Sequence, residues 1–206
     1  MHRLRRHLSV LQQFLIGSGE RLTSSGAPDH VSRTLPLWLR LADAADEPFI
    51  GELFNTAKAE QFAGAGLPRA VLDALLEQQF RAQTSSYAAQ FPAATSLIIL
   101  ERDHAIGRLL LHCEARCWHI IDIVLLPSVR GRGIGTDVIQ MVASAASRDA
   151  VRRLTLIVLA SNAAARRLYA RLGFVETGSA AGATHITMQK DLVNCCGAAG
   201  VDDWSI

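Results

Sequence analysis

The alternation of apolar and polar positions along the chain predicts a series of strands. Residues 37–41 alternate leucine with Trp38 and Arg40, which is the two-residue period of a strand. Short apolar runs at 97–101 and 105–112 are joined by a polar turn, and this arrangement predicts a hairpin. Similar apolar runs predict further strands at 118–126, 154–159, 174–177 and 185–190.

Apolar residues that recur at three- and four-residue intervals predict helices between these strands. The first helix follows a cap at Asp43 or Asp46 and has Pro48 in its first turn. The second begins at Pro68 and ends before Pro92. Two more helices are expected at 136–148 and 162–172.

The order of these elements predicts a mixed sheet in one domain at residues 35–192. A helix connects the strands at 118–126 and 154–159, so these two strands should be parallel and joined by a right-handed crossover. Residues 1–34 are expected to be a basic extension, and residues 193–206 a short tail for which the sequence predicts no structure.

The extension allows more than one interpretation. Leu4, Leu8, Leu11 and Leu15 recur at helical spacing among several arginines. This pattern fits a basic amphipathic helix at a membrane surface or an organelle-targeting peptide. It also fits a flexible tail, or a start codon assigned too far upstream. The sequence leaves these alternatives open.

Composition excludes several broad classes of protein. Half of the residues are hydrophobic and 19% are charged, which is typical of a globular chain. The net charge of +2 is too small to favour nucleic-acid binding. No apolar run reaches the roughly 20 residues that span a membrane. The four cysteines lack the spacing of a zinc site or a disulfide framework, so a reducing cytoplasm is the expected compartment.

A glycine-rich turn between a predicted strand and a predicted helix is the clearest chemical signal. The strand ends at Pro127, and the sequence R-G-R-G-I-G follows at residues 130–135. Glycines let a ligand approach the backbone, and the first amides of a helix attract anions. A P-loop would require a lysine here, and a dinucleotide fingerprint would require G-x-G-x-x-G. The turn therefore predicts a phosphate site of another kind.

Two segments of the chain together resemble the GNAT-type N-acetyltransferases. Arg130, Gly133 and Gly135 match the family's acyl-coenzyme A signature, Q/R-x-x-G-x-G/A. In the family an Asn then opens a later helix, a Tyr follows two turns on, and L-G-F ends the helix. Asn162, Tyr169 and residues 172–174 reproduce that order and spacing. The resemblance covers residues 37–192 and is strongest after residue 120.

The resemblance implies an α+β fold with a mixed, mostly antiparallel central sheet flanked by helices around a parallel β-α-β core. It implies acetyl-coenzyme A (acetyl-CoA) as co-substrate, with pantetheine in a gap between the two parallel strands. Asn162 would contact the pantetheine arm or simply cap its helix. The cofactor-binding residues implied are Ile123, Val124, Leu125, Arg130, Gly131, Arg132, Gly133, Ile134, Gly135, Thr136, Asn162 and Ala165.

Tyr169 stands at the family's acid position, and a phenol is protonated at pH 7. The base is less defined, because Ile157 occupies a position where some relatives have Glu. His119 occupies the position used by other relatives, and a histidine suits a base at neutral pH. Asp122 is the competitor. A two-residue strand period would place it on the opposite face from His119, so the two should not serve one site, and Asp122 would either be the base or form an ion pair.

The function expected from the resemblance is transfer of an acetyl group from acetyl-CoA to a primary amine of a small molecule, peptide or protein. The alternative is a non-catalytic acyl-CoA sensor. Substrate choice is expected to lie in residues 49–91. No metal is expected, although two histidines and two cysteines cluster at 112–119. We expect no nucleic-acid partner and no integral membrane segment, and a monomer or homodimer.

Overall fold

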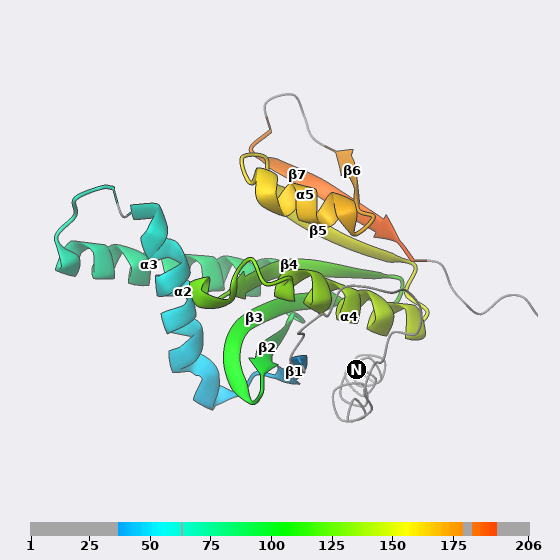
Figure 1. The fold of residues 1–206 in the computed structure, drawn as a ribbon, viewed down its shortest axis with the longest axis horizontal. Helices are drawn as coiled ribbons and strands as arrows, with labels where there is room; N and C mark the ends of the chain where they lie inside the picture. The colour runs from blue at the N-terminus through cyan, green and yellow to red at the C-terminus, as the bar shows by residue number, and fades with distance from the viewer. Residues whose placement is uncertain (1–36, 63, 179–182, 193–206) are drawn as a thin grey trace, which may run out of the picture.

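The computed structural model describes residues 37–62, 64–178 and 183–192 (Figure 1). The predicted extension at 1–34 and the predicted tail at 193–206 lie outside these residues. The sheet has seven strands in the order β1-β2-β3-β4-β5-β7-β6. The strands are β1 (Leu37–Leu41), β2 (Thr95–Glu101), β3 (His104–Cys113), β4 (Cys117–Leu125), β5 (Arg153–Leu159), β6 (Val175–Gly178) and β7 (His185–Asp191).

Every neighbouring pair in this sheet is antiparallel except β4 and β5, which are parallel. The mixed, mostly antiparallel sheet with one parallel β-α-β unit is therefore confirmed. The helices are α2 (Glu47–Phe62), α3 (Arg69–Gln90), α4 (Ile134–Arg148) and α5 (Ala163–Arg171), with short 3-10 turns η1 (Ala44–Asp46) and η2 (Pro127–Val129). The helix expected to open at Thr136 begins two residues earlier.

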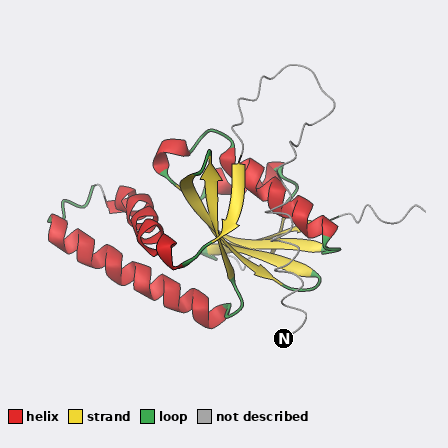
Figure 2. Cartoon of the chain, turned by 90° about the horizontal axis from the view of Figure 1, so that it is seen from below, coloured by secondary structure: helices red, strands yellow, loops and turns green. Residues whose placement is uncertain are grey.

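The helices cover the two faces of the sheet. Helices α2 and α3 cover one face of the half made by β1 to β4, while α4 and α5 lie against the other face (Figure 2). The main core lies between the sheet and the second pair, around Trp118, Val138 and Leu156. None of the helices in the described part of the chain is long and apolar enough to cross a membrane.

Strands β4 and β5 pair over only part of their length. Their pairing runs from Cys117 opposite Arg153 to Ile120 opposite Leu156. Beyond that point β4 stays paired with β3 and β5 stays paired with β7, so the two halves of the sheet diverge (Figure 1). The predicted gap between the two parallel strands is present, and its β4 edge carries unpaired backbone groups that can bind an extended ligand.

A β-bulge in β4 occurs where this gap opens. Ile120 pairs with Leu111 of β3 and Asp122 pairs with Leu110, so Ile121 is an extra residue. Leu110 shares a face of β3 with His112, which pairs with His119. The bulge therefore puts Asp122 on the same face as His119. The prediction that these side chains lie on opposite faces is wrong, because it assumed an unbroken two-residue period.

Candidate active site

The glycine turn, residues 130–135, has the backbone geometry of an anion-binding loop. Gly131 and Gly133 have φ values of +75° and +85°, a region that L side chains rarely adopt. A Cβ atom added at either glycine would meet nothing within 4 Å. Gly133 is also the N-cap of α4 and contributes no side chain to capping. The turn is therefore open to a ligand where α4 begins.

Five consecutive backbone N–H groups of this turn, from residues 131–135, have no hydrogen-bond partner among the described residues. The next amide, that of Thr136, donates to the Gly133 carbonyl at 2.8 Å and is already satisfied. Unpartnered amides at the positive end of a helix dipole form a ready site for phosphate oxygens. The amides from residue 131 to Gly135 are therefore available to a ligand, while the Thr136 amide serves the helix.

The two arginines of the turn face carboxylates. Arg130 donates to Glu60 of α2 at 2.7 Å and also to the Leu125 carbonyl at 3.2 Å. Arg132 forms a two-bond pair with Glu101 at 2.6 and 3.1 Å. Exposed ion pairs of this kind contribute little to stability, roughly 0–1 kcal/mol. Both guanidinium groups are therefore held by carboxylate partners beside the glycine turn.

Helix α5 starts at the other side of the gap. The Asn162 side chain accepts a hydrogen bond from the Ala165 amide at 3.1 Å, so its capping role is confirmed. That bond uses the Asn162 oxygen and leaves the side-chain NH₂ group to donate elsewhere. The Ala165 amide is occupied by the cap, and the Ala165 side chain packs against the core.

Tyr169 is buried, with 8% of its surface exposed, and its ring packs against Phe174 at a centroid distance of 5.8 Å. Its hydroxyl has no hydrogen-bond partner among the described residues. Burial raises the pKa of the Tyr169 phenol, and the charge of Asp122 raises it further. The phenol is therefore a protonated donor that holds no competing bond.

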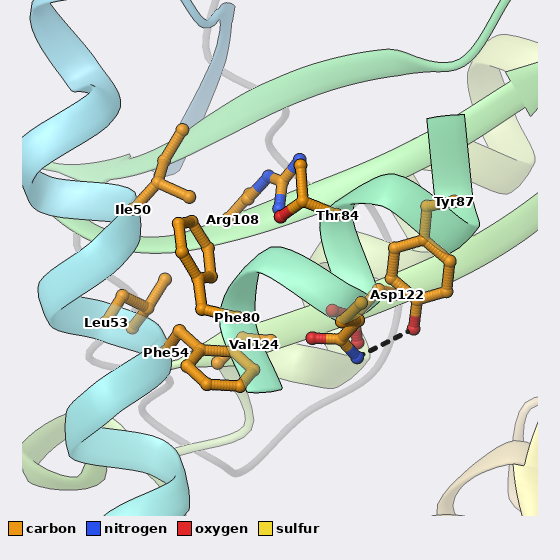
Figure 3. A pocket seen from close by; sticks show the side chains of 10 residues that line it. Ile50, Leu53, Phe54, Phe80, Thr84, Tyr87, Arg108, Asp122 and Val124 are labelled. Carbon is orange, nitrogen blue, oxygen red and sulfur yellow. Dashed lines mark hydrogen bonds between the residues drawn. The ribbon is translucent and has the colours of Figure 1, made fainter. Parts of the chain in front are cut away.

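A hollow lies on the face of the sheet opposite to α4 and α5, between α2, α3 and the strands β3 and β4 (Figure 3). It contains about 310 Å³ of empty space, part of it open to solvent. Most of its wall comes from residues 49–91, the segment expected to select the substrate. Its lining residues are Ile50, Leu53, Phe54, Phe80, Gln83, Thr84, Tyr87, Arg108, Asp122 and Val124.

Asp122 lies in this hollow just beyond the point where β4 leaves β5 (Figure 3). No ion pair joins it to any other described residue, so the predicted ion pair is not found. Burial raises the pKa of the Asp122 carboxyl, while Arg108 and Lys58 oppose that shift. The Asp122 charge also raises the pKa values of Tyr87 and Tyr169, which lie on opposite faces of the sheet.

His119 lies beside the paired part of β4 and β5. Its Nδ1 is 2.9 Å from the Thr155 hydroxyl, and its ring stacks on Phe91 at a centroid distance of 5.3 Å. Burial lowers the pKa of His119, and the neighbouring His112 lowers it further. His119 therefore shares a face with Asp122 but is held by two neighbours. Ile157, on β5 across the gap, is 51% exposed and has no ionisable group.

The fold and the matched sequence together identify the family. Residues 71–174, more than half of the chain, match the acetyltransferase (GNAT) family. The chain belongs to the GNAT acetyltransferase family. Its fold is also that of solved acetyltransferases. Comparison of the sequence with curated proteins found no match.

Three solved structures illustrate the shared fold. The PaiA N-acetyltransferase of Thermoplasma acidophilum, in complex with coenzyme A, has a TM-score of 0.59 and 13% identity over 76% of this chain and 99% of its own. An acetyltransferase from Thermus thermophilus has a TM-score of 0.56 and 20% identity over 77% and 98%. The ribosomal-protein-S18-alanine N-acetyltransferase of Escherichia coli has a TM-score of 0.54 and 17% identity over 82% and 100%.

Sequence reasoning missed the side chains that form the hollow. Arg108 was not singled out, although a charged residue inside the apolar run 105–112 is a signal that a polar feature lies against that strand. Tyr87 was considered only as part of a helix. The hollow brings both together with Asp122, and it leaves His119 beside Phe91.

Proposed function

We propose that this GNAT-family protein is an N-acetyltransferase that moves the acetyl group of acetyl-CoA to a primary amine. One observation carries the proposal. The sheet opens between β4 and β5, with five unpartnered amides and Tyr169 on one face and the Asp122 hollow on the other. An acyl donor and an acceptor can therefore approach the same opening from opposite faces.

In this proposal the donor is held mainly by the backbone. The amides of residues 131–135 bind the pyrophosphate, and the free β4 edge at residues 123–125 pairs with the pantetheine amides. The Asn162 side-chain NH₂ group faces the arm from α5. Arg130 and Arg132 exchange their carboxylate partners for phosphate oxygens. The shared family and the coenzyme A complex of a fold neighbour support this arrangement.

Asp122 is the base in this scheme. A lysine-like ammonium group has a pKa near 10.4 and must lose a proton before its nitrogen can attack. The carboxylate of Asp122 has no ion-pair partner among the described residues, lies at the opening, and has a pKa raised by burial towards the range useful for a base. His119 is the second candidate, less favoured because Phe91 and Thr155 hold its ring before the opening begins.

Tyr169 is the acid. The ammonium loses one proton to Asp122, and the neutral nitrogen attacks the thioester carbonyl. The new C–N bond forms and the C–S bond breaks, while the Tyr169 hydroxyl gives its proton to the departing sulfur. The second proton released by the nitrogen restores the phenol through water. The raised pKa of Tyr169 keeps it protonated until the thiolate develops.

A release assay tests this function. Purified full-length protein is incubated with acetyl-CoA and a panel of primary amines, and free coenzyme A thiol and acetylated product are measured together. The expected result is release that depends on an amine and matches product one for one. The alternative of a non-catalytic sensor draws support from Ile157, which provides no carboxylate. Tight acetyl-CoA binding by calorimetry with no release on any amine would favour the sensor and contradict catalysis.

A further inference from the structure

Two opposite charges lie next to each other in the hollow without pairing. In the β3–β4 register Arg108 pairs with Val124 and Leu110 pairs with Asp122, so Arg108 and Asp122 are diagonal neighbours on one face. Diagonal positions of this kind are roughly 7–8 Å apart. No hydrogen bond or ion pair joins the two side chains in the described part of the chain. The two charged ends therefore interact through space, without a direct bond.

Arg108 is one of the residues that line the hollow (Figure 3). Its Nε donates to the Ser96 hydroxyl at 2.9 Å, and that bond fixes the guanidinium group. Its two terminal nitrogens have no hydrogen-bond partner among the described residues. A guanidinium group with both terminal nitrogens free presents the geometry that binds a carboxylate through two parallel bonds.

The remaining wall of the hollow is apolar. Phe54 and Phe80 pack against each other at a centroid distance of 5.2 Å, and Leu53, Ile50 and Val124 complete the surface. The described lining has no second carboxylate beside Asp122. The space is partly open to solvent, so its volume sets no size limit on a ligand. Such a wall can contact one apolar side chain.

We propose that the acceptor is a free α-amino acid with an apolar side chain, with its carboxylate on Arg108, its amino group at Asp122 and its side chain against the two phenylalanines. This inference rests on the proposed function, because it names the amine that the transferase acetylates. It makes Arg108 a specificity-determining residue, which binds the carboxylate of the acceptor and does not touch the reacting atoms.

The charges of an α-amino acid match those of the hollow. Burial lowers the pKa of Arg108 and raises that of Asp122, so each ion is disfavoured by lost hydration. A ligand with an adjacent anion and cation compensates both. A polyamine would bring several cations to a hollow whose lining has one carboxylate and one arginine. The lysine side chain of a protein would leave Arg108 without an anion.

The first test needs no variant. L-phenylalanine, L-phenylalaninamide and 2-phenylethylamine share an apolar side chain and a primary amine, and only the first has the carboxylate. We expect kcat/KM for L-phenylalanine to exceed that for either analogue by about 10- to 100-fold, the effect of one hydrogen bond to a charged group. Spermidine and a lysine-containing peptide complete the panel. Equal or better turnover of any carboxylate-free amine overturns the inference.

The second test assigns the preference to Arg108. In Arg108→Gln the advantage of L-phenylalanine over 2-phenylethylamine should fall to within about threefold, mainly through a higher KM for the amino acid. Arg69→Gln removes an exposed arginine at the start of α3 and is the matched control, with unchanged preference. A preference that survives in a folded Arg108→Gln protein contradicts the assignment.

Binding separates this inference from the proposed function. Calorimetric titration of L-phenylalanine into the protein saturated with coenzyme A reports acceptor binding without chemistry. Binding that weakens in Arg108→Gln, with no acetyl transfer, would support the amino-acid site and reject the transferase. Transfer to other amines with no binding of the amino acid would retain the transferase and reject this inference. If the protein shows neither binding of the amino acid nor acetyl transfer, both this inference and the proposed function are rejected.

Discussion

The glycine turn and the hollow lie on opposite faces of one opening in the sheet, and they are built in different ways. The turn consists of six consecutive residues whose proposed function comes from backbone amides and two positive φ values. The hollow takes its side chains from α2, α3, β3 and β4, which are far apart in the sequence. A site made of backbone tolerates most changes of side chain, whereas a site made of side chains changes its ligand with each of them.

This difference separates the effects of substitutions on the two faces. Changes in the turn should alter acetyl-CoA affinity and leave acceptor preference intact. Changes in the hollow should alter the acceptor or the chemistry and leave acetyl-CoA affinity intact. A substitution that affects both properties would mean that the two faces act as a single unit.

Asp122→Asn should have the largest effect. The amide keeps the shape of the side chain but cannot take a proton, so kcat/KM should fall about 10²–10⁴-fold with acetyl-CoA affinity unchanged. The measurement is steady-state release of coenzyme A, paired with calorimetry for acetyl-CoA. In the native protein kcat/KM should fall as pH drops through the raised pKa of Asp122, because the base is active only when deprotonated.

Stability provides the control for Asp122→Asn. The pKa of Asp122 is higher in the folded protein than in the unfolded chain, so between the two values the folded state binds more protons and stability falls as pH rises. At neutral pH the native protein therefore carries a cost that asparagine removes. The variant should melt no lower than the native protein. Full activity in this variant would transfer the role of base to His119 or water.

Tyr169→Phe should lower kcat by about 10²–10⁴-fold, because it removes the proton donor and keeps the ring against Phe174. The Tyr169 hydroxyl has no partner among the described residues, so the melting temperature should change little. The loss should shrink with acyl donors whose thiol is a better leaving group. Unchanged turnover on an amine for which chemistry is rate-limiting would make Tyr169 a packing residue.

Gly133→Val should weaken acetyl-CoA binding about 10- to 100-fold, the effect of losing one hydrogen bond to a charged group. A β-branched residue is strained at a φ of +85°, and its side chain would fill the open space above the amides. Calorimetric titration measures the change, and circular dichroism checks the fold. Gly64→Val, in a loop with open space around the glycine, is the control. Native affinity in folded Gly133→Val would contradict the phosphate site.

His119→Ala should have the smallest effect on rate, less than about threefold, because Asp122 retains the role of base. It should lower stability by about 1–2 kcal/mol through loss of the Thr155 hydrogen bond and the Phe91 stack. Chemical denaturation and a full pH–rate profile measure both. If the variant loses the acidic limb of the profile, His119 is the base and Asp122 is not.

The sequence predicted the geometry of the candidate site well where its parts are local. The strand ending at Pro127, the glycines and the helix start all lie within a few residues, so their spacing alone indicated an anion site. Asn162 caps the helix that contains Tyr169, two turns further on, so their positions on one side of that helix could also be predicted from the sequence. The strand and helix ranges were confirmed to within a few residues for the same reason.

The hollow was not predictable in the same way. Residues 49–91 were expected to select the substrate, but which helix face meets β3 and β4 depends on tertiary packing. Arg108 and Asp122 become neighbours through strand register, and that register includes a bulge. A period of two assumes regular strands, so it placed Asp122 on the wrong face. The missing information was long-range pairing rather than side-chain chemistry.

The extra residue Ile121 has a consequence for the shape of the whole sheet. A bulge bends its strand and increases the local twist, and this one sits directly after Ile120, the last residue of β4 that pairs with β5. The opening therefore depends on one extra residue in β4 as well as on the side chains around it. A deletion of Ile121 would give β4 a regular path alongside β5. The two halves of the sheet would then close on each other, and the proposed donor and acceptor would lose the opening between β4 and β5.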